Sequence, residues 1–335
     1  THTTPDPLSI QRLMANMVEV GCSHCFMEVS SHAVDQQRIA GIHFSGAIFT
    51  NITPEHLDYH GSFQNYLLAK QGLFNGLPTS AFALANKDDR NGRVMLQNTA
   101  ARRLTYSLRS VADYHARVLE KSFEGMLINF EGREVYCRLT GKFNAYNLVA
   151  VYGAARELGL PAGSLLPALS DLHPARGRFE VINLQGGAIG LVDYAHTPDA
   201  LKNVLETVWE VNQANGQVIS LIGCGGERDT QKRPEMARIA VQLSDTVILT
   251  SDNPRNEDPE AIIEEMRAGV PLTKQNKLLP IVNRREAIRV GARLAGRGDV
   301  FLVAGKGHET YQEILGERRF FDDREELLRA VGQTS

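Results

Sequence analysis

The chain has 335 residues, more than one ordinary hydrophobic core accommodates, and this length predicts two or three domains. It is 43% hydrophobic and 22% charged, with a formal net charge of −3, which is typical of a soluble globular protein and excludes a disordered or strongly nucleic-acid-binding chain. No apolar run approaches the roughly 18–20 residues that span a bilayer, and no signal-peptide pattern opens the chain. We therefore expect a cytoplasmic protein without membrane insertion.

The cysteines do not predict a disulfide framework, because only four are scattered along the chain. Cys22 and Cys25 have the C-x-x-C spacing of a redox motif or a zinc half-site. No second pair follows at zinc spacing, and an apolar strand is expected to begin at this point. We therefore expect Cys22 and Cys25 to be ordinary buried thiols.

The first part of the chain alternates predicted helices and apolar strands. Apolar residues at helical spacing predict helices over 8–20 and 63–75. Strands are expected at 25–31, 46–53 and 81–86. Continuously apolar strands that alternate with helices are typical of a parallel sheet covered on both faces.

The middle of the chain has a different pattern. From about residue 103 to 140, apolar and polar residues alternate between glycine-bearing turns, which predicts an antiparallel patch. Two helices are expected at 144–158 and 162–171. A segment with proline and glycine at 173–179 then predicts a domain boundary.

We therefore expect a first domain at 1–174 and a second at 175–335. The α/β alternation restarts in the second domain and ends in a central strand. Its predicted strands cover 188–195, 217–226, 246–254 and 299–309, and its predicted helices cover 198–213, 232–242, 258–267 and 284–295.

Four of these strands end in polar loops, at 193–196, 223–229, 251–255 and 305–309. In open parallel sheets, ligands bind at the carboxyl ends of the strands. The residue pattern alone therefore predicts a ligand site at this edge of the second sheet.

The first domain also carries polar residues at successive strand ends. Glu28 follows one predicted strand, His56 and Asp58 follow the next, and Lys70 lies on the helix after them. A carboxylate and an imidazole at neighbouring strand ends can share a divalent cation, with water completing the shell. Each residue alone is more often a solvated surface residue, but their common position favours a metal site. Lys70 either is exposed on its helix or points across the site.

The second domain carries the charges of an amino-acid pocket. Arg255 follows Pro254 just after a strand, where a guanidinium suits bidentate capture of a carboxylate. Arg228, from another strand end, could supply a second guanidinium, and Glu309 offers an acceptor for an ammonium group. These residues predict a pocket for a zwitterionic amino acid, and the alternative is a surface ion-pair network.

Nine linked motifs, in order from Thr3 to about Asp323, resemble the Mur ligase family, and the set is similar to the members that add meso-diaminopimelate. The motifs are MEVSSH followed by R, TNITPEHLDYHG, a lysine on the next helix, GKFNAYN, RGRFE, DYAHTPDAL, GCGGERD, DNPR and AGKGHE.

The resemblance implies a P-loop-NTPase-like central domain, with a mostly parallel sheet and an antiparallel patch, followed by a Rossmann-like α/β C-terminal domain. It implies an ATP-dependent, amide-bond-forming ligase of peptidoglycan precursor synthesis. ATP would phosphorylate a carboxylate of UDP-N-acetylmuramoyl-L-alanyl-D-glutamate (the UDP-muramoyl-dipeptide), and the amine of meso-2,6-diaminopimelate would attack the acyl phosphate. The expected partners are these small molecules and no nucleic acid, and the expected state is a monomer.

The resemblance also implies roles for individual residues. Glu28 and His56 match ligands of magnesium (Mg²⁺), and Lys70 matches a lysine that is carbamylated into a carboxylate-like metal partner. Lys70 and His196 match catalytic positions. The remaining matches are to the UDP-muramoyl-dipeptide (Thr3, Thr4, Ser30, Gln36, Arg38), to ATP (Asn144, Asn147, Arg178, Asp193, Tyr194, His196) and to diaminopimelate (Arg228, Asp252, Asn253, Arg255, Gly305, Glu309).

The chain departs from the family at the phosphate loop. No G-x-x-x-x-G-K-[ST] segment is present, and Gly305, Lys306 and Gly307 do not replace it, because no Ser or Thr opening a helix follows the lysine. The sequence therefore predicts an N-terminally truncated central domain that lacks its first strand and phosphate loop. Without the backbone donors and lysine of that loop, we expect the chain as written to have little or no activity.

Three alternatives stay open. Arg255 opposes a lysine-adding Mur ligase, whose substrate has no distal carboxylate. GCGGERD together with DNPR opposes a folylpolyglutamate synthase-like ligase. A non-catalytic binding protein that kept the fold is opposed by the retained set Glu28, His56, Lys70, Asp193 and His196.

Overall fold

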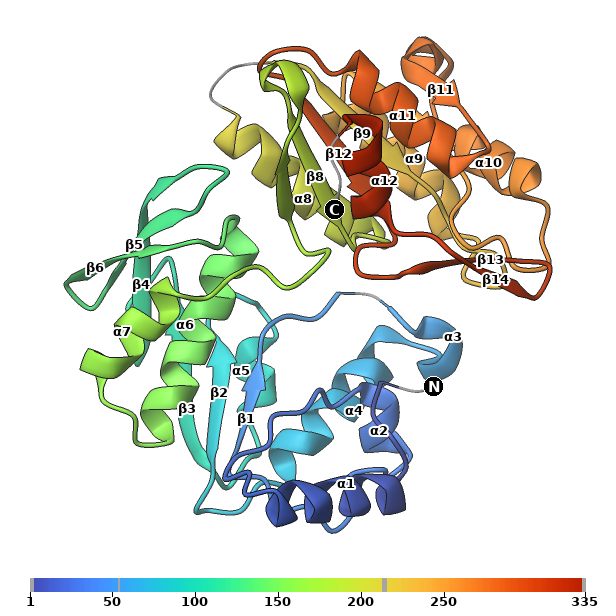
Figure 1. The fold of residues 1–335 in the computed structure, drawn as a ribbon. Coiled ribbons are helices and arrows are strands. Elements are labelled where there is room, and N and C mark those ends of the chain that lie inside the picture. Colours follow the sequence, from blue (N-terminus) through green and yellow to red (C-terminus); the bar gives the residue numbers. More distant parts are fainter. Residues whose placement is uncertain (1–2, 54, 213–215, 333–335) are drawn as a thin grey trace. The chain divides into compact units, whose positions relative to one another are not determined.

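The computed structural model describes residues 3–53, 55–212 and 216–332 (Figure 1). The chain divides into two compact units. The first consists of residues 1–118, 128–135 and 144–169, and the second of residues 119–127, 136–143 and 170–335.

The first sheet has six strands in the order β1-β2-β3-β4-β5-β6. Its first four strands pair in parallel, as expected for alternating helices and apolar strands. The segments 122–125 and 131–132 then connect β4 to β5 and β5 to β6, and connections this short join antiparallel strands. The strands are β1 Gly46–Phe49, β2 Phe82–Asn86, β3 Arg102–Ser107, β4 Tyr114–Lys121, β5 Met126–Phe130 and β6 Arg133–Cys137.

The helix α4 (Phe63–Asn75) shows how the sequence builds this part of the chain. The Ser62 side chain accepts a hydrogen bond from the Asn65 backbone N–H and caps the helix at its start. Its buried face includes Tyr66 and Phe74, which belong to the core beside β1 and β2. The other helices are α1 Pro7–Glu19, α2 Ser31–Asp35, α3 Leu57–His60, α5 Gly92–Met95, α6 Lys142–Glu157 and α7 Ala162–Ser170.

The predicted strand at 25–31 is wrong. Residues 23–30 form neither helix nor strand, and residue 31 begins α2. A strand needs a neighbour for its backbone hydrogen bonds, and in the described part of the sheet the edge strand β1 pairs with β2 alone. Cys22 and Cys25 are accordingly exposed, which corrects the prediction of buried thiols.

The second sheet has the order β11-β10-β9-β12-β8-β7, with β7 antiparallel to β8 and the other strands parallel. The predicted central strand is confirmed, because β12 lies between β9 and β8 and is fully buried. The strands are β7 Glu180–Asn183, β8 Ile189–Asp193, β9 Val218–Ile222, β10 Thr246–Leu249, β11 Leu278–Pro280 and β12 Val300–Ala304.

Helices cover both faces of this sheet. Successive residues of β12 alternate between two cores: Leu302 packs with α8, α9 and α10, whereas Phe301 packs with α11 and α12. This arrangement confirms the Rossmann-like fold expected for the second domain. The helices are α8 Pro198–Val211, α9 Lys232–Leu243, α10 Pro259–Ala268, α11 Arg284–Leu294 and α12 Asp323–Ala330, and the predicted end of α8 at residue 213 lies outside the described residues.

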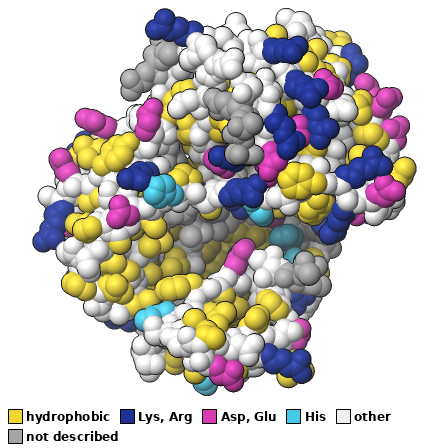
Figure 2. All heavy atoms as spheres, viewed as in Figure 1, with side chains coloured by type: hydrophobic (Ala, Val, Ile, Leu, Met, Phe, Trp, Pro, Cys, Tyr) yellow, Lys and Arg dark blue, Asp and Glu magenta, His cyan; other side chains and the backbone are white. Residues whose placement is uncertain are grey.

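A small antiparallel hairpin of β13 (Tyr311–Ile314) and β14 (Glu317–Phe320) and two short 3-10 helices, Gln185–Gly187 and Leu272–Lys277, complete the second unit. Figure 2 shows basic side chains interspersed with acidic ones over α11 and α12. Among them, Arg285 pairs with Glu326 at 2.8 Å and Arg289 with Glu286 at 2.7 Å. None of the described helices is long and apolar enough to cross a membrane.

Candidate functional site

The polar loops of the second unit begin at one edge of its sheet. The strands β10, β9, β12 and β8 are consecutive neighbours and run parallel. Their register places Ala304 beside Asp193 and Leu249 beside Ile222, so the four loops leave the sheet at nearly the same level. The predicted common edge of the four loops is therefore confirmed, and its use as a ligand site stays a prediction.

The residues matched to diaminopimelate binding surround a buried lysine. The Asn253 amide Nδ2 donates to Glu309 Oε2 at 2.8 Å. Lys306 Nζ donates to Asn253 Oδ1 at 3.0 Å and to Glu309 Oε2 at 3.2 Å, and Asp252 Oδ1 lies 3.8 Å from the same nitrogen. Lys306 is fully buried. Lys306 was not among the residues predicted for this pocket, although it lies within the AGKGHE motif.

Arg255 is held by its backbone as well as by its side chain. It has a left-handed backbone with φ of 53°. Its N–H donates to Glu313 O, and its carbonyl accepts from Leu315 N–H, so the β13–β14 hairpin fixes its position. Its guanidinium Nη1 donates to Gly226 O at 2.6 Å.

Glycines make room for the charged side chains of this edge. A Cβ on Gly225 would lie 3.1 Å from Arg255 Nη1 and 3.7 Å from Arg228 Cγ, so the glycine turn after β9 brings the two arginines together. Gly305 has φ of 118°, and a Cβ there would come within 2.7 Å of Asp252 Oδ2. The sequence predicted both arginines for one pocket, and in the structure both approach the Gly225 turn.

Four residues matched to ATP binding are also together in the second unit. The buried Asp193 carboxylate accepts from Ala195 N–H and Phe179 N–H, each at 2.7 Å. Burial raises the pKa of Asp193, and these two donors oppose that rise. The Arg178 guanidinium lies 4.7 Å above the Tyr194 ring, whose centroid is 4.5 Å from that of His196.

The other two matched positions lie on a different part of the chain. Asn144 and Asn147 are on α6 and belong to the first unit.

The His308 ring, which the sequence did not single out, packs 4.9 Å from Tyr194 in the second unit.

In the first unit, the residues matched to the UDP-muramoyl-dipeptide form one hydrogen-bond network. The Thr4 hydroxyl donates to Glu28 O at 3.0 Å and accepts from Ser30 N–H at 3.2 Å. Arg38 Nη1 donates to Thr4 O at 3.0 Å, and its Nη2 donates to the Gln36 side chain. The structure therefore brings together these four of the five predicted residues, and the fifth, Thr3, lines the adjacent cavity.

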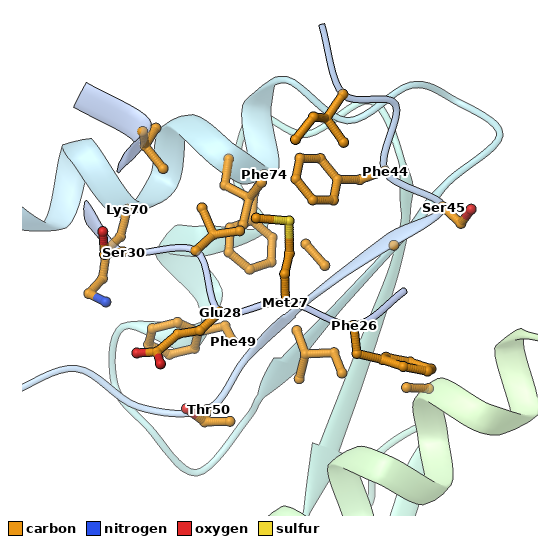
Figure 3. A pocket seen from close by; sticks show the side chains of 18 of the residues that line it. Phe26, Met27, Glu28, Ser30, Phe44, Ser45, Phe49, Thr50, Lys70 and Phe74 are labelled. Carbon is orange, nitrogen blue, oxygen red and sulfur yellow. The ribbon is translucent and has the colours of Figure 1, made fainter. Parts of the chain in front are cut away.

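A cavity of about 910 Å³ lies beside β1 in the first unit and is lined by Thr3, Glu28, Ser30, His56 and Lys70. Figure 3 shows the Lys70 amino group and the Glu28 carboxylate directed toward the same side of it. The rest of the lining includes apolar side chains such as Phe26, Met27, Phe44, Phe49 and Phe74.

Lys70 sits in surroundings that disfavour its charge. Burial lowers its pKa, and the carboxylates of Glu55 and Glu28 offset part of that decrease. Its Nζ lies 5.2 Å from the centre of the Tyr66 ring. The sequence left two orientations open for Lys70, and the structure shows that it faces the cavity.

The side chains of Glu28 and His56 alone do not complete the predicted metal site. His56 has a left-handed backbone with φ of 57°, and its ring lies 4.9 Å from that of His32. Among the described residues, no group of three or more histidine, cysteine, aspartate or glutamate side chains could hold a metal ion. A metal held by Glu28 and His56 would therefore need a further ligand, and this role stays a prediction.

Comparisons with known proteins place both parts of the chain in one family. Residues 1–155 match the Mur ligase middle domain, and residues 177–307 match the glutamate ligase domain of Mur ligases. A protein of Parabacteroides distasonis named UDP-N-acetylmuramoyl-L-alanyl-D-glutamate--2,6-diaminopimelate ligase is 55% identical over 326 residues, which cover 97% of this chain and 67% of that protein.

Comparisons with solved structures support the same family. One of a UDP-N-acetylmuramoyl-L-alanyl-D-glutamate--2,6-diaminopimelate ligase is 39% identical, with a TM-score of 0.66, and the match covers 99% of this chain and 69% of that one. A MurF ligase of Thermotoga maritima in complex with ADP is 17% identical, with a TM-score of 0.63 over 82% of this chain and 61% of that one, and supports the fold alone. The chain belongs to the Mur ligase family.

Proposed function

We propose that the protein is an ATP-dependent ligase that joins meso-2,6-diaminopimelate to UDP-N-acetylmuramoyl-L-alanyl-D-glutamate in peptidoglycan precursor synthesis. The observation that carries this proposal is the cluster of charged and polar side chains at the ends of β9, β10 and β12. Arg228 and Arg255 both approach one glycine turn there, and Asn253 and Glu309 are hydrogen-bonded to one another. The names of the relatives, given above, support the same substrate.

The proposed pocket offers a positive and a negative partner for the distal end of diaminopimelate, which carries a carboxylate and an ammonium group. The Arg255 guanidinium suits the distal carboxylate of diaminopimelate, and Arg228 supplies a second cation nearby. Glu309 offers a carboxylate to the distal ammonium, and Asp252 adds negative charge beside it. Lysine lacks the distal carboxylate, so Arg255 favours diaminopimelate over a lysine substrate.

The reaction needs the substrate carboxylate to be activated. Its oxygen attacks the terminal phosphorus of ATP, ADP leaves, and the diaminopimelate amine then forms the C–N bond as phosphate departs. We assign Asn144, Asn147, Arg178, Asp193, Tyr194 and His196 to ATP binding, with His196 also catalytic. Thr3, Thr4, Ser30, Gln36 and Arg38 are assigned to the UDP-muramoyl-dipeptide.

Glu28, His56 and Lys70 are the proposed holders of Mg²⁺, which would neutralise phosphate charge. Glu28 and His56 supply two side-chain donors, with water and phosphate oxygens to complete the shell, and Lys70 would add a third. A neutral lysine amine reacts with carbon dioxide to give a carbamate, and burial of Lys70 favours that neutral form. Carbamylation would supply the third, oxygen-bearing ligand that magnesium prefers.

Further assignments follow from the family. We propose a central domain at 1–174 and an amino-acid-binding domain at 175–335, in a cytoplasmic, monomeric enzyme. The 335 residues contain no G-x-x-x-x-G-K-[ST] segment, so we expect them to carry out little or no ligation alone. An assay of ATP-dependent ligation with these residues would test that expectation, and normal turnover would contradict it.

Direct binding tests the substrate assignment without turnover. The chain would be titrated with meso-diaminopimelate, L-lysine and L-glutamate, and binding followed by ligand-observed NMR. We expect diaminopimelate to bind at least about tenfold more tightly than the other two, because each lacks one of the charges that the pocket pairs. Equal affinity for lysine would support a lysine-adding ligase, and preference for glutamate would support a folylpolyglutamate synthase-like ligase.

A further inference from the structure

We propose that Lys306 is a positioning residue of the amino-acid pocket, which holds Asn253, Glu309 and, through the β13–β14 hairpin, Arg255 in binding geometry. This inference rests on the proposed function. It concerns a residue that lies between two glycines and has no exposed atoms from which to contact a ligand freely.

The burial of Lys306 requires compensation. A lysine ammonium loses hydration when buried, and acceptors around it must replace the lost water. Asn253 Oδ1 and Glu309 Oε2 accept from Nζ at 3.0 and 3.2 Å, and Asp252 contributes a carboxylate at 3.8 Å. The centre of the Tyr311 ring lies 5.5 Å from the same nitrogen. The lysine therefore lies among groups of the pocket and of the adjoining hairpin.

The neighbouring glycines direct Lys306 inward. Gly305 and Gly307 have φ of 118° and 51°, values that glycine adopts without the strain other residues meet. A Cβ on Gly307 would come within 2.6 Å of Tyr194 Cβ. This turn lets the lysine enter the interior directly after β12 ends.

Lys306 fixes the orientation of the Asn253 amide. An ammonium group is a donor only, so it selects the amide oxygen and turns the Nδ2 group toward Glu309. The Glu313 N–H donates to the same oxygen at 3.0 Å and supports the same orientation. The opposite amide orientation would place an N–H₂ group against both donors.

The same contacts organise Glu309. The bonds from Asn253 and Lys306 both reach Oε2, and in the described part of the chain this leaves Oε1 to accept from a ligand ammonium. Lys306 also repels such an ammonium, and this repulsion opposes the positioning effect. The two hydrogen bonds to Oε2 favour the positioning effect, because a carboxylate displaced by about 1 Å loses most of its contact with the ligand.

The same hydrogen-bond network extends to Arg255, the proposed partner of the distal carboxylate of the ligand. Glu313 donates through its N–H to Asn253, and its carbonyl accepts from Arg255 N–H at 3.1 Å. Loss of Lys306 therefore releases the acceptor side of the pocket directly and the Arg255 side through the hairpin.

Replacement of Lys306 by methionine tests the proposal, since it removes the ammonium and keeps an unbranched stem. We expect meso-diaminopimelate to bind about tenfold or more weakly to Lys306→Met, by ligand-observed NMR titration. L-2-Aminopimelate keeps both carboxylates and lacks one ammonium, so its affinity should fall by a smaller factor. Unchanged or tighter binding of diaminopimelate, or an equal loss for both ligands, would overturn the proposal.

The control is Lys277→Met. Lys277 donates to Ser244 O at 2.8 Å and precedes β11, at the amino ends of the parallel strands. Its loss removes a partly buried lysine of the same unit and should leave both affinities unchanged. If Lys306→Met does not fold, Lys306→Gln carries the same tests, because it keeps a donor for Asn253 without the charge and should show an intermediate loss.

A ligand-free measurement separates this proposal from the substrate assignment. If the wild-type chain binds no diaminopimelate, the proposed function fails, but the positioning role is still readable from ¹⁵N spectra. We expect Lys306→Met to shift the Asn253 side-chain amide and the Arg255 Nε–H resonances, and Lys277→Met to shift neither. Unchanged resonances in Lys306→Met would overturn the positioning role.

Discussion

Arg284 and Asp323 form a fully buried, doubly hydrogen-bonded ion pair, in which Nε and Nη2 each donate to a different carboxylate oxygen at 2.7 Å. Nη2 also donates to Ala304 O at 3.0 Å, at the end of β12. The pair therefore ties the first residues of α11 and α12 to the strand that leads into Gly305 and Lys306.

Removal of one partner should destabilise the protein strongly. We expect Arg284→Met to lower the free energy of unfolding by about 3–5 kcal/mol, because it leaves Asp323 buried without its cation. Urea unfolding followed by circular dichroism measures the change. The double variant Arg284→Met/Asp323→Leu should recover most of the loss, and a double variant as unstable as the single one would contradict this explanation.

The close approach of Gly177 to the loop after β12 gives a second prediction. A Cβ on Gly177 would come within 2.1 Å of Gly307 C and 2.3 Å of His308 N, and φ is 67°. Gly186 has φ of 78° with nothing within 4 Å of its Cβ position. Gly186→Ala should therefore cost about 1–2 kcal/mol of unfolding free energy from its backbone alone, and Gly177→Ala about 1–3 kcal/mol more. If the two variants are equally stable toward heat and toward urea, Gly177 does not approach the loop after β12 closely.

Lys70 should react with carbon dioxide. Because burial lowers the pKa of Lys70, its neutral amine is present at a lower pH than that of an exposed lysine. In ¹³C-labelled bicarbonate we expect a carbamate signal that grows as pH rises through this lowered pKa and is absent from Lys70→Gln. Lys202, an exposed lysine, supplies the control, and Lys202→Gln should keep the signal. A signal that survives in Lys70→Gln would rule out this assignment.

Much of the second unit could be predicted from the sequence, because its strands are continuously apolar and end in polar loops. The central position of β12 and the common edge of the loops after β8, β9, β10 and β12 follow from that pattern. The strands β7, β11, β13 and β14 were not predicted. In β14 all four residues are exposed, so no buried face leaves an apolar signal.

The errors in the first unit have a different cause. The mostly apolar residues 25–29 predict a strand, but the sequence pattern does not show whether a neighbouring strand is available to pair with it. Lys306 was missed for a related reason, since its role depends on Asn253, which reaches it from the loop after β10. The contact with Asn253 depends on the order of the strands in the sheet, which a sequence motif by itself does not show.

Arg255→Ala gives the most direct test of the central claim, the recognition of diaminopimelate. Meso-diaminopimelate and L-lysine would each be titrated into the wild-type chain, into Arg255→Ala, and into Arg289→Ala as a control at an arginine on α11 of the same unit that is 50% exposed. Loss of a charge-assisted partner should weaken diaminopimelate binding by about 2–5 kcal/mol, leave the affinity for lysine nearly unchanged, and so remove the preference for diaminopimelate. Arg289→Ala should keep the preference, and an equal loss for both ligands in Arg255→Ala would contradict the account.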